Sequence, residues 1–65
     1  MGMPDLGHAI RAIREEHGLS LRELARLSGT NPTYLSQVER GLRVPTKRWL
    51  RSVTKALGEH MSEAS

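Results

Sequence analysis

Apolar residues in the first part of the chain recur at the spacing of one face of an α-helix. The first series has the i, i+3, i+4, i+7 pattern and consists of Leu6, Ala9, Ile10 and Ile13. Asp5 can cap the start of this helix, and Gly18 can take a left-handed conformation just beyond its end. The pattern therefore predicts an amphipathic helix that buries this series and ends before Gly18.

The next helix has the clearest start signal in the chain. Ser20 and Glu23 have the spacing of a capping box, in which each side chain bonds the backbone amide of the other residue. Leu19 and Leu24 lie at the two positions of a hydrophobic staple around it. We expect Gly29 to end this helix, and its inward face to consist of Leu24, Ala25 and Leu27.

Two further helices are predicted in the second half of the chain. Asn31 caps the first of them, Pro32 occupies its first helical position and Gly41 ends it. Its inward residues are Leu35 and Val38. Thr46 caps the second and Gly58 is expected to end it. Its buried residues are expected to be Trp49, Leu50, Val53, Ala56 and Leu57.

The predicted organisation is a single all-α domain. No segment sustains the alternation of apolar and polar residues that is typical of a strand. Residues 6–58 form the domain, residues 1–5 a flexible N-terminus, and the polar residues 59–65 a disordered tail. Residues 28–30 make a turn so short that the helices on either side must cross steeply, and Gly29 supplies the positive φ that such a turn needs.

Charge is distributed unevenly along the chain. Residues 21–55 carry eight Lys and Arg against two Glu, whereas residues 1–20 and 56–65 are both net negative. A positive middle is typical of a surface that faces a polyanion. On charge alone, a set of solvated helix faces is an equal alternative.

Several classes of protein are not expected. The 65 residues include no cysteine, and no apolar run approaches the roughly 20 residues of a membrane span. The N-terminus lacks the pattern of a signal peptide, so we expect a cytoplasmic protein with no membrane partner. His8 and His17 are half a helical turn out of phase and cannot share a metal ion. We expect neither an enzyme nor any cofactor or metal.

Two stretches of the sequence resemble a known family. The segments Gly18–Ala25 and Gly29–Gly41 are similar to the helix-turn-helix of the phage Cro and repressor family, also called the xenobiotic-response-element family. The likeness extends from about Leu6 to Gly58. It implies a compact lambda-repressor-like domain of four helices, with or without a frayed fifth. It also implies an ion pair between Arg14 and Glu39, for which ordinary surface charge is the alternative.

The resemblance implies that the segment Asn31–Arg40 lies in the major groove of DNA. Thr33 and Gln37 match family positions that commonly contact base edges. A Gln amide can pair bidentately with adenine, and a Thr methyl group can contact thymine. Pro32 and Ser36 lie on the same outward face and are further candidates for base contacts. The alternative for these side chains is simple solvation.

Other residues are candidates for contacts with the DNA backbone. Arg43, Lys47 and Arg48 flank the start of the fourth helix, where a phosphate is attracted by free amides and by the helix dipole. Arg22 can act similarly at the second helix, and the Tyr34 hydroxyl can either meet a phosphate or serve packing alone. The full set of candidates is Arg22, Asn31, Tyr34, Arg40, Arg43, Lys47 and Arg48.

The chain departs from the family pattern at four positions. Leu21 stands where the family often has a Gln that can bond the DNA backbone, which Leu cannot do. Ser28 replaces a residue that is commonly apolar. Lys47 and Thr54 occupy places that are often aliphatic and Ala, respectively. These departures affect single contacts and some core packing, but not the expected fold.

The expected function is sequence-specific binding of double-stranded DNA that regulates transcription as a repressor. A single module buries only about 600–1,000 Å² on DNA, so we expect a homodimer on DNA or a partner protein. Two alternatives remain. One is a protein-interaction module such as an antitoxin or adaptor, since fold alone does not fix function. The other is non-specific or architectural DNA binding.

Overall fold

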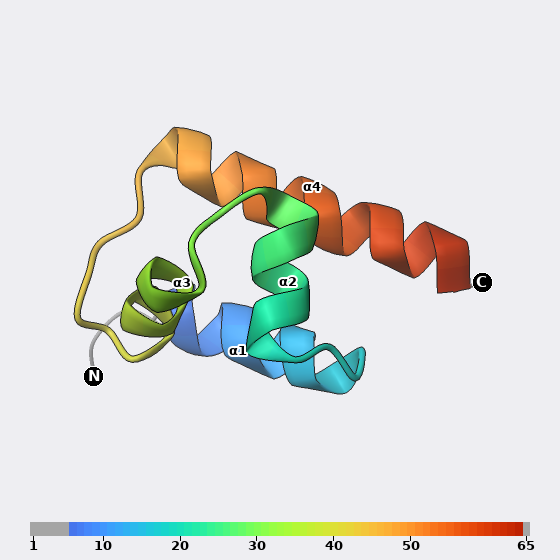
Figure 1. The fold of residues 1–65 in the computed structure, drawn as a ribbon, viewed down its shortest axis with the longest axis horizontal. Helices are drawn as coiled ribbons and strands as arrows, with labels where there is room; N and C mark the ends of the chain where they lie inside the picture. The colour runs from blue at the N-terminus through green and yellow to red at the C-terminus, as the bar shows by residue number, and fades with distance from the viewer. Residues whose placement is uncertain (1–5, 65) are drawn as a thin grey trace.

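The computed structural model describes residues 6–64, with side chains described as far as His60. In this range the fold is all-helical, as predicted, with α1 (Leu6–Glu16), α2 (Leu21–Ser28), α3 (Pro32–Glu39) and α4 (Lys47–Ala64). The short helix α2 lies between α1 and the long helix α4 (Figure 1). It packs against α3 and α4, while α1 packs against α3. No helix within residues 6–64 is long and apolar enough to cross a membrane.

The predicted helix caps are confirmed where the structure describes them. The Glu23 amide donates to Ser20 Oγ at 3.0 Å, and the Ser20 amide donates to Glu23 Oε1 at 2.7 Å, which completes the capping box. Asn31 Oδ1 accepts from the Thr33 amide at 2.7 Å, and Thr46 Oγ1 accepts from the Trp49 amide at 3.1 Å. The expected cap of α1 at Asp5 lies outside the described residues.

The turn between α2 and α3 depends on a left-handed glycine. Gly29 has φ 68° and ψ 31°, and its amide donates to the Arg26 carbonyl at 3.2 Å. The Thr30 amide then donates to the Ala25 carbonyl at 2.8 Å. These bonds satisfy two of the last four carbonyls of α2, at Ala25 and Arg26, and the chain reverses within three residues. The helix α3 then crosses α2, as the sequence predicted (Figure 1).

The core is formed by side chains from all four helices. Leu24 of α2, Leu35 and Val38 of α3, and Val53 of α4 are fully buried. The other buried residues of the core are Ile10, Leu19, Ala25, Ala56 and Leu57, with Leu21, Tyr34, Trp49 and Leu50 packed partly against it. This set is close to the predicted one for α2, α3 and α4.

Of the predicted inward face of α1, Ile10 is confirmed, while Leu6, Ala9 and Ile13 are wrong, and so is one residue of α2. Leu6 and Ile13 are 52% and 40% exposed, and Ala9 is also exposed. The helix instead turns Gly7 inward beside Ile10. Because Gly7 has no Cβ, the backbone of α1 can approach the backbone of α3 at Val38, where a Cβ on residue 7 would clash with the Val38 carbonyl. In α2, the inward series is Leu21, Leu24, Ala25 and Ser28, which leaves Leu27 exposed.

The predicted end of the fourth helix at Gly58 is also wrong. The helix α4 continues through Gly58 to Ala64, so most of the segment predicted to be disordered is helical. Gly58 does not have positive φ, and an interior glycine costs a helix only about 1 kcal/mol relative to alanine. The part of α4 beyond Gly58 contacts the turn after α1, where the rings of His17 and His60 pack edge to face with their centres 5.9 Å apart. Residues 1–5, predicted to be flexible, lie outside the described residues.

Candidate nucleic-acid interface

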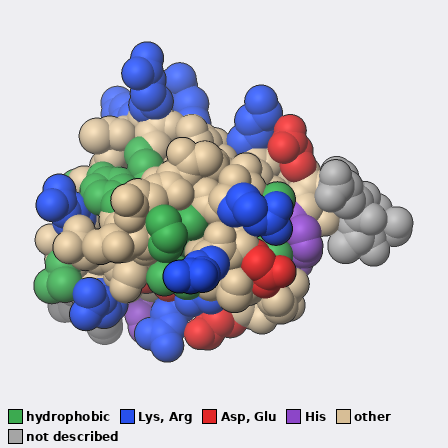
Figure 2. Space-filling view, viewed as in Figure 1, with side chains coloured by type: hydrophobic (Ala, Val, Ile, Leu, Met, Phe, Trp, Pro, Cys, Tyr) green, Lys and Arg blue, Asp and Glu red, His purple; other side chains and the backbone are tan. Residues whose placement is uncertain are grey.

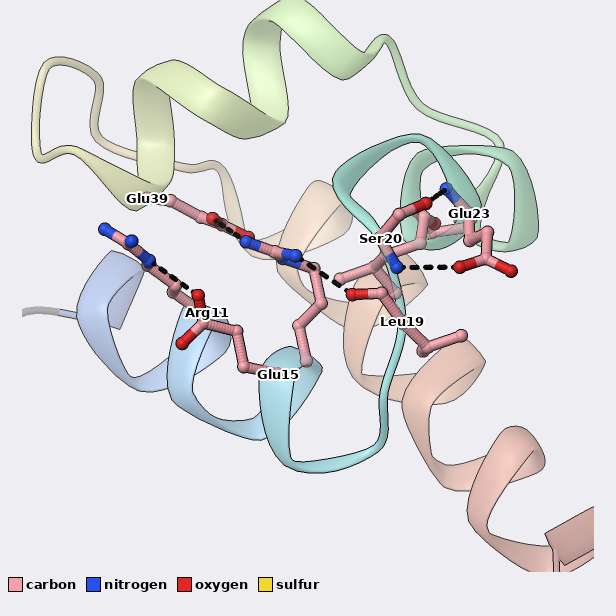
Figure 3. A network of polar contacts seen from close by, with 9 residues as sticks. Arg11, Glu15, Leu19, Ser20, Glu23 and Glu39 are labelled. Atoms are coloured by element: carbon pink, nitrogen blue, oxygen red, sulfur yellow. Dashed lines mark hydrogen bonds and ion pairs between the residues drawn. The ribbon is translucent and has the colours of Figure 1, made fainter.

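A buried ion pair fixes α3 on α1. Arg14 donates to both carboxylate oxygens of Glu39, from Nε at 2.8 Å and from a terminal nitrogen at 2.9 Å. Its third bond, at 3.0 Å, goes to the Leu19 carbonyl (Figure 3). The two side chains are 11% and 4% exposed, and the hydrogen bond with Glu39 raises the pKa of Arg14 above its ordinary value. The structure thus brings together the two residues that the resemblance paired.

The outward face of α3 is polar and accessible. Because Leu35 and Val38 are buried, the opposite side of the helix carries Pro32, Thr33, Ser36 and Arg40. These four residues line an open groove of about 390 Å³ together with Leu21 and Arg22 from the start of α2. Four of the six lining residues are candidates named from the sequence for α3, and Arg22 is a fifth.

Three of the four candidate base-contacting residues line this groove, and the fourth, Gln37, does not. Pro32 and Thr33 are exposed, while Ser36 and Gln37 are half-buried. Asn31, at the start of the helix, uses its side-chain oxygen Oδ1 for capping, which leaves the Nδ2 group of the same amide for other contacts. The first two turns of α3 therefore present a hydroxyl, an amide and a methyl group outward from one rigid element.

A chain of side-chain contacts connects α3 with the loop that precedes α4. Arg43 Nε donates to Gln37 Oε1 at 2.8 Å, and its guanidinium carbon lies 5.6 Å from the centre of the Tyr34 ring. The Tyr34 ring meets Trp49 edge to face at 5.1 Å. The Trp49 indole N–H donates to Thr30 Oγ1. Tyr34 therefore has a packing role, and nothing in the sequence pattern indicated the Arg43–Gln37 hydrogen bond.

Cations surround this face of the molecule. The side chains of the five candidates of this kind are all exposed, namely those of Arg22, Arg40, Arg43, Lys47 and Arg48. Figure 2 shows Lys and Arg side chains projecting over the start of α4. Among the residues the structure describes, no three His, Cys, Asp or Glu side chains gather as a metal site would require. The arrangement is therefore one of neutral hydrogen-bonding groups within a positive rim.

A family model described as a helix-turn-helix domain matches residues 5–64 of this chain. The chain belongs to this helix-turn-helix family. Its fold is similar to that of the clp gene regulator ClgR from C. glutamicum, with a TM-score of 0.80 and 46% identity over 83% of this chain and 69% of that one.

Sequence relatives carry the same type of domain within longer proteins. An uncharacterised HTH-type transcriptional regulator of Mycobacterium tuberculosis, Rv0474, is 51% identical over 78% of this chain and 36% of its own length. The HTH-type transcriptional regulator SinR of Bacillus subtilis is 40% identical over 80% of this chain and 48% of its own length. The chain therefore spans less than half the length of these two relatives.

Proposed function

We propose that this domain binds double-stranded DNA in a sequence-specific manner, with α3 in the major groove, and that it regulates transcription. The observation that carries the proposal is the polar outward face of α3 within a rim of exposed cations. Neutral donors and acceptors on a helix can contact base edges, while the surrounding cations bind phosphates without selecting a sequence. Relatives named as transcriptional regulators support the same function.

The proposed base contacts come from the outward face of α3. Thr33 and Gln37 meet the base edges, with Pro32 and Ser36 beside them. The proposed backbone contacts come from the rim and from the ends of the recognition helix, that is, from Arg22, Asn31, Tyr34, Arg40, Arg43, Lys47 and Arg48.

The first turns of two helices, α4 and α2, support the proposed contacts with the DNA backbone. At α4, Thr46 accepts from the Trp49 amide, and the amides of Lys47 and Arg48 precede the first bonded turn. At α2, Arg22 stands in the first turn, beside the groove along α3. A phosphate at either place gains from the helix dipole and from an adjacent cation together.

The proposal includes repression by occupancy of an operator and binding as a dimer on two half-sites. One module of this size buries about 600–1,000 Å² on DNA, and half-sites for such dimers are spaced about 34 Å apart. A protein-interaction module would be expected to present an apolar stripe on α3, whereas the outward residues here are polar or charged apart from Pro32. This difference favours DNA as the partner.

The test is the selection of bound duplexes from a randomised DNA pool at near-physiological salt. Enrichment of an inverted repeat supports specific recognition by a dimer, and its spacing gives the geometry of the dimer. Enrichment of a single short motif supports specific recognition and contradicts the dimer. Uniform binding of all duplexes contradicts sequence-specific recognition and supports non-specific DNA binding. No binding of any duplex overturns the proposal in favour of a protein partner.

A further inference from the structure

The groove beside α3 has an apolar surface that belongs partly to α2. Leu21 is the first residue of α2, and it lines the groove together with Pro32 and Thr33. The Leu21 side chain is half-buried and packs partly against the core, so the part that remains accessible is held in place. The capping box at Ser20 fixes the start of the helix that carries it. The groove therefore presents apolar atoms at a defined position beside the outward face of α3.

The charges of the same groove favour DNA as its occupant over an apolar segment of a protein. Arg22 and Arg40 both line the groove, and both are exposed. No Asp or Glu among the described residues lines it. Cations beside an apolar contact match a base edge in the major groove, because such an edge is flanked by the phosphates of the DNA backbone.

The chemistry of leucine limits what Leu21 can contact on a base pair. Base pairs present donors and acceptors in the major groove, and thymine alone adds an apolar group there, its C5-methyl. A leucine placed against a donor or acceptor would displace water from that group without replacing its hydrogen bond, which is unfavourable. The methyl group of thymine is therefore the group on a base edge that Leu21 can contact favourably.

We propose that Leu21, together with Pro32 and the methyl group of Thr33, forms an apolar contact for the 5-methyl group of a thymine, and that this contact selects thymine at one base pair of the binding site. The inference rests on the proposed function, since it concerns DNA on the same face of α3. Leu21 is then a specificity-determining residue, at a position where the family often has a Gln that can bond the DNA backbone.

The experiment uses a duplex obtained by the selection, in which each thymine is replaced in turn by deoxyuridine. Deoxyuridine pairs as thymine does and lacks only the 5-methyl group. The readout is the ratio of the Kd for the deoxyuridine duplex to the Kd for the thymine duplex, measured by fluorescence anisotropy at constant salt. Because it is a ratio, it is unaffected by a new backbone contact that a variant makes with both duplexes alike.

Three variants are compared with the parent chain. Leu21→Met and Leu21→Gln place unbranched side chains of similar length at the same position, one apolar and the other polar. Since the family often has Gln at this position, Leu21→Gln is compatible with the fold. Leu27→Gln is the matched control, because Leu27 is an exposed leucine of the same helix that does not line the groove. Thermal melting of each variant, followed by circular dichroism, verifies that the compared proteins are folded.

The parent is expected to bind about fourfold more weakly when the contacted thymine loses its methyl group, the factor that corresponds to the burial of one methyl-sized apolar group. Leu21→Met and Leu27→Gln are expected to keep this dependence on the methyl group. Leu21→Gln is expected to bind the two duplexes about equally, because a polar side chain gains nothing from the methyl group.

Three results would overturn the inference while leaving specific DNA binding intact. In the first, the parent shows no methyl dependence at any thymine of the selected duplex. In the second, Leu21→Gln keeps the methyl dependence at every thymine where the parent shows it. In the third, Leu21→Met or Leu27→Gln loses it as Leu21→Gln does. A parent chain that enriches no sequence from the pool overturns the proposed function, and the inference with it.

Discussion

Replacing Glu39 with alanine is expected to destabilise the domain more than the removal of any surface charge. The substitution leaves the Arg14 guanidinium with its one bond to the Leu19 carbonyl, at a site where the Arg14 side chain is 11% exposed. Removing one partner of a buried ion pair typically costs about 3–5 kcal/mol. A domain of 65 residues has a total stability of about 3–10 kcal/mol, so the loss is a large fraction of the whole.

The assay is thermal unfolding followed by circular dichroism, in parallel with urea unfolding. At about 4–8 °C per kcal/mol for a domain of this size, Glu39→Ala should lower Tm by at least about 12 °C. The matched control is Glu15→Ala, which breaks the exposed Arg11–Glu15 pair, whose side chains are 54% and 56% exposed. That pair is worth about 0.3–0.5 kcal/mol. If Glu39→Ala lowered Tm no more than Glu15→Ala does, the buried pair would not hold α3 on α1 as argued.

Three further predictions concern other parts of the molecule. Gly58→Ala should raise the free energy of unfolding by about 0.5–1 kcal/mol, because the new methyl group meets no atom and the helix is continuous there. Gly7→Ala should lower the free energy of unfolding by about 1–3 kcal/mol, because its methyl group would clash with the Val38 carbonyl. Urea unfolding that ranked the two variants the other way would contradict the structure. The capping bond from the Ser20 amide lowers the pKa of Glu23 below 4.5, so its stabilisation is present above that pH and is lost as pH falls through the lowered value. Unfolding measured between pH 7 and pH 2 should therefore show a weaker acid dependence in Glu23→Gln than in the parent. Lys47→Ala should reduce the slope of log K against log salt by about 0.9 for every duplex, and an unchanged slope would remove Lys47 from the phosphate contacts.

Local chemistry explains why most element boundaries could be predicted from the sequence. The capping box at Ser20, the Asn31 cap and the left-handed Gly29 each act within a few residues, so their patterns predict the same geometry in any fold. The face of α1 could not be predicted in this way. Its periodicity favoured Leu6 and Ile13, while the observed orientation follows from contacts with α3, which is distant in sequence.

The end of α4 is a second feature that the local sequence did not predict. A glycine after a buried apolar pair is typical of a helix end, yet Gly58 lies inside a helix that continues to Ala64. The ring contact between His17 and His60 joins segments far apart in sequence, and no local pattern indicates it. Prediction from a single sequence therefore failed where tertiary contacts act on an ambiguous local signal.

For the candidate interface, the sequence predicted which residues face outward but not how they are connected. The outward direction of α3 follows from the burial of Leu35 and Val38, and the apolar pattern of the sequence predicts that these two residues are buried. The bond between Arg43 and Gln37 depends on the path of a loop, which has no periodicity to predict it.

Two of the four departures from the family pattern are accommodated by local hydrogen bonds, and a third, Leu21, shifts the proposed backbone contact at α2. Ser28, at a position that is commonly apolar, donates from its hydroxyl to the Leu24 carbonyl at 2.7 Å, and Thr54 donates to the Leu50 carbonyl at 3.0 Å. The half-buried Ser28 hydroxyl therefore has a partner and does not weaken the fold as an unsatisfied buried group would, and Thr54 is exposed. Leu21 packs partly against the core and cannot bond a phosphate. The proposed contact with the DNA backbone at the start of α2 therefore rests on Arg22, the adjacent exposed residue that lines the same groove.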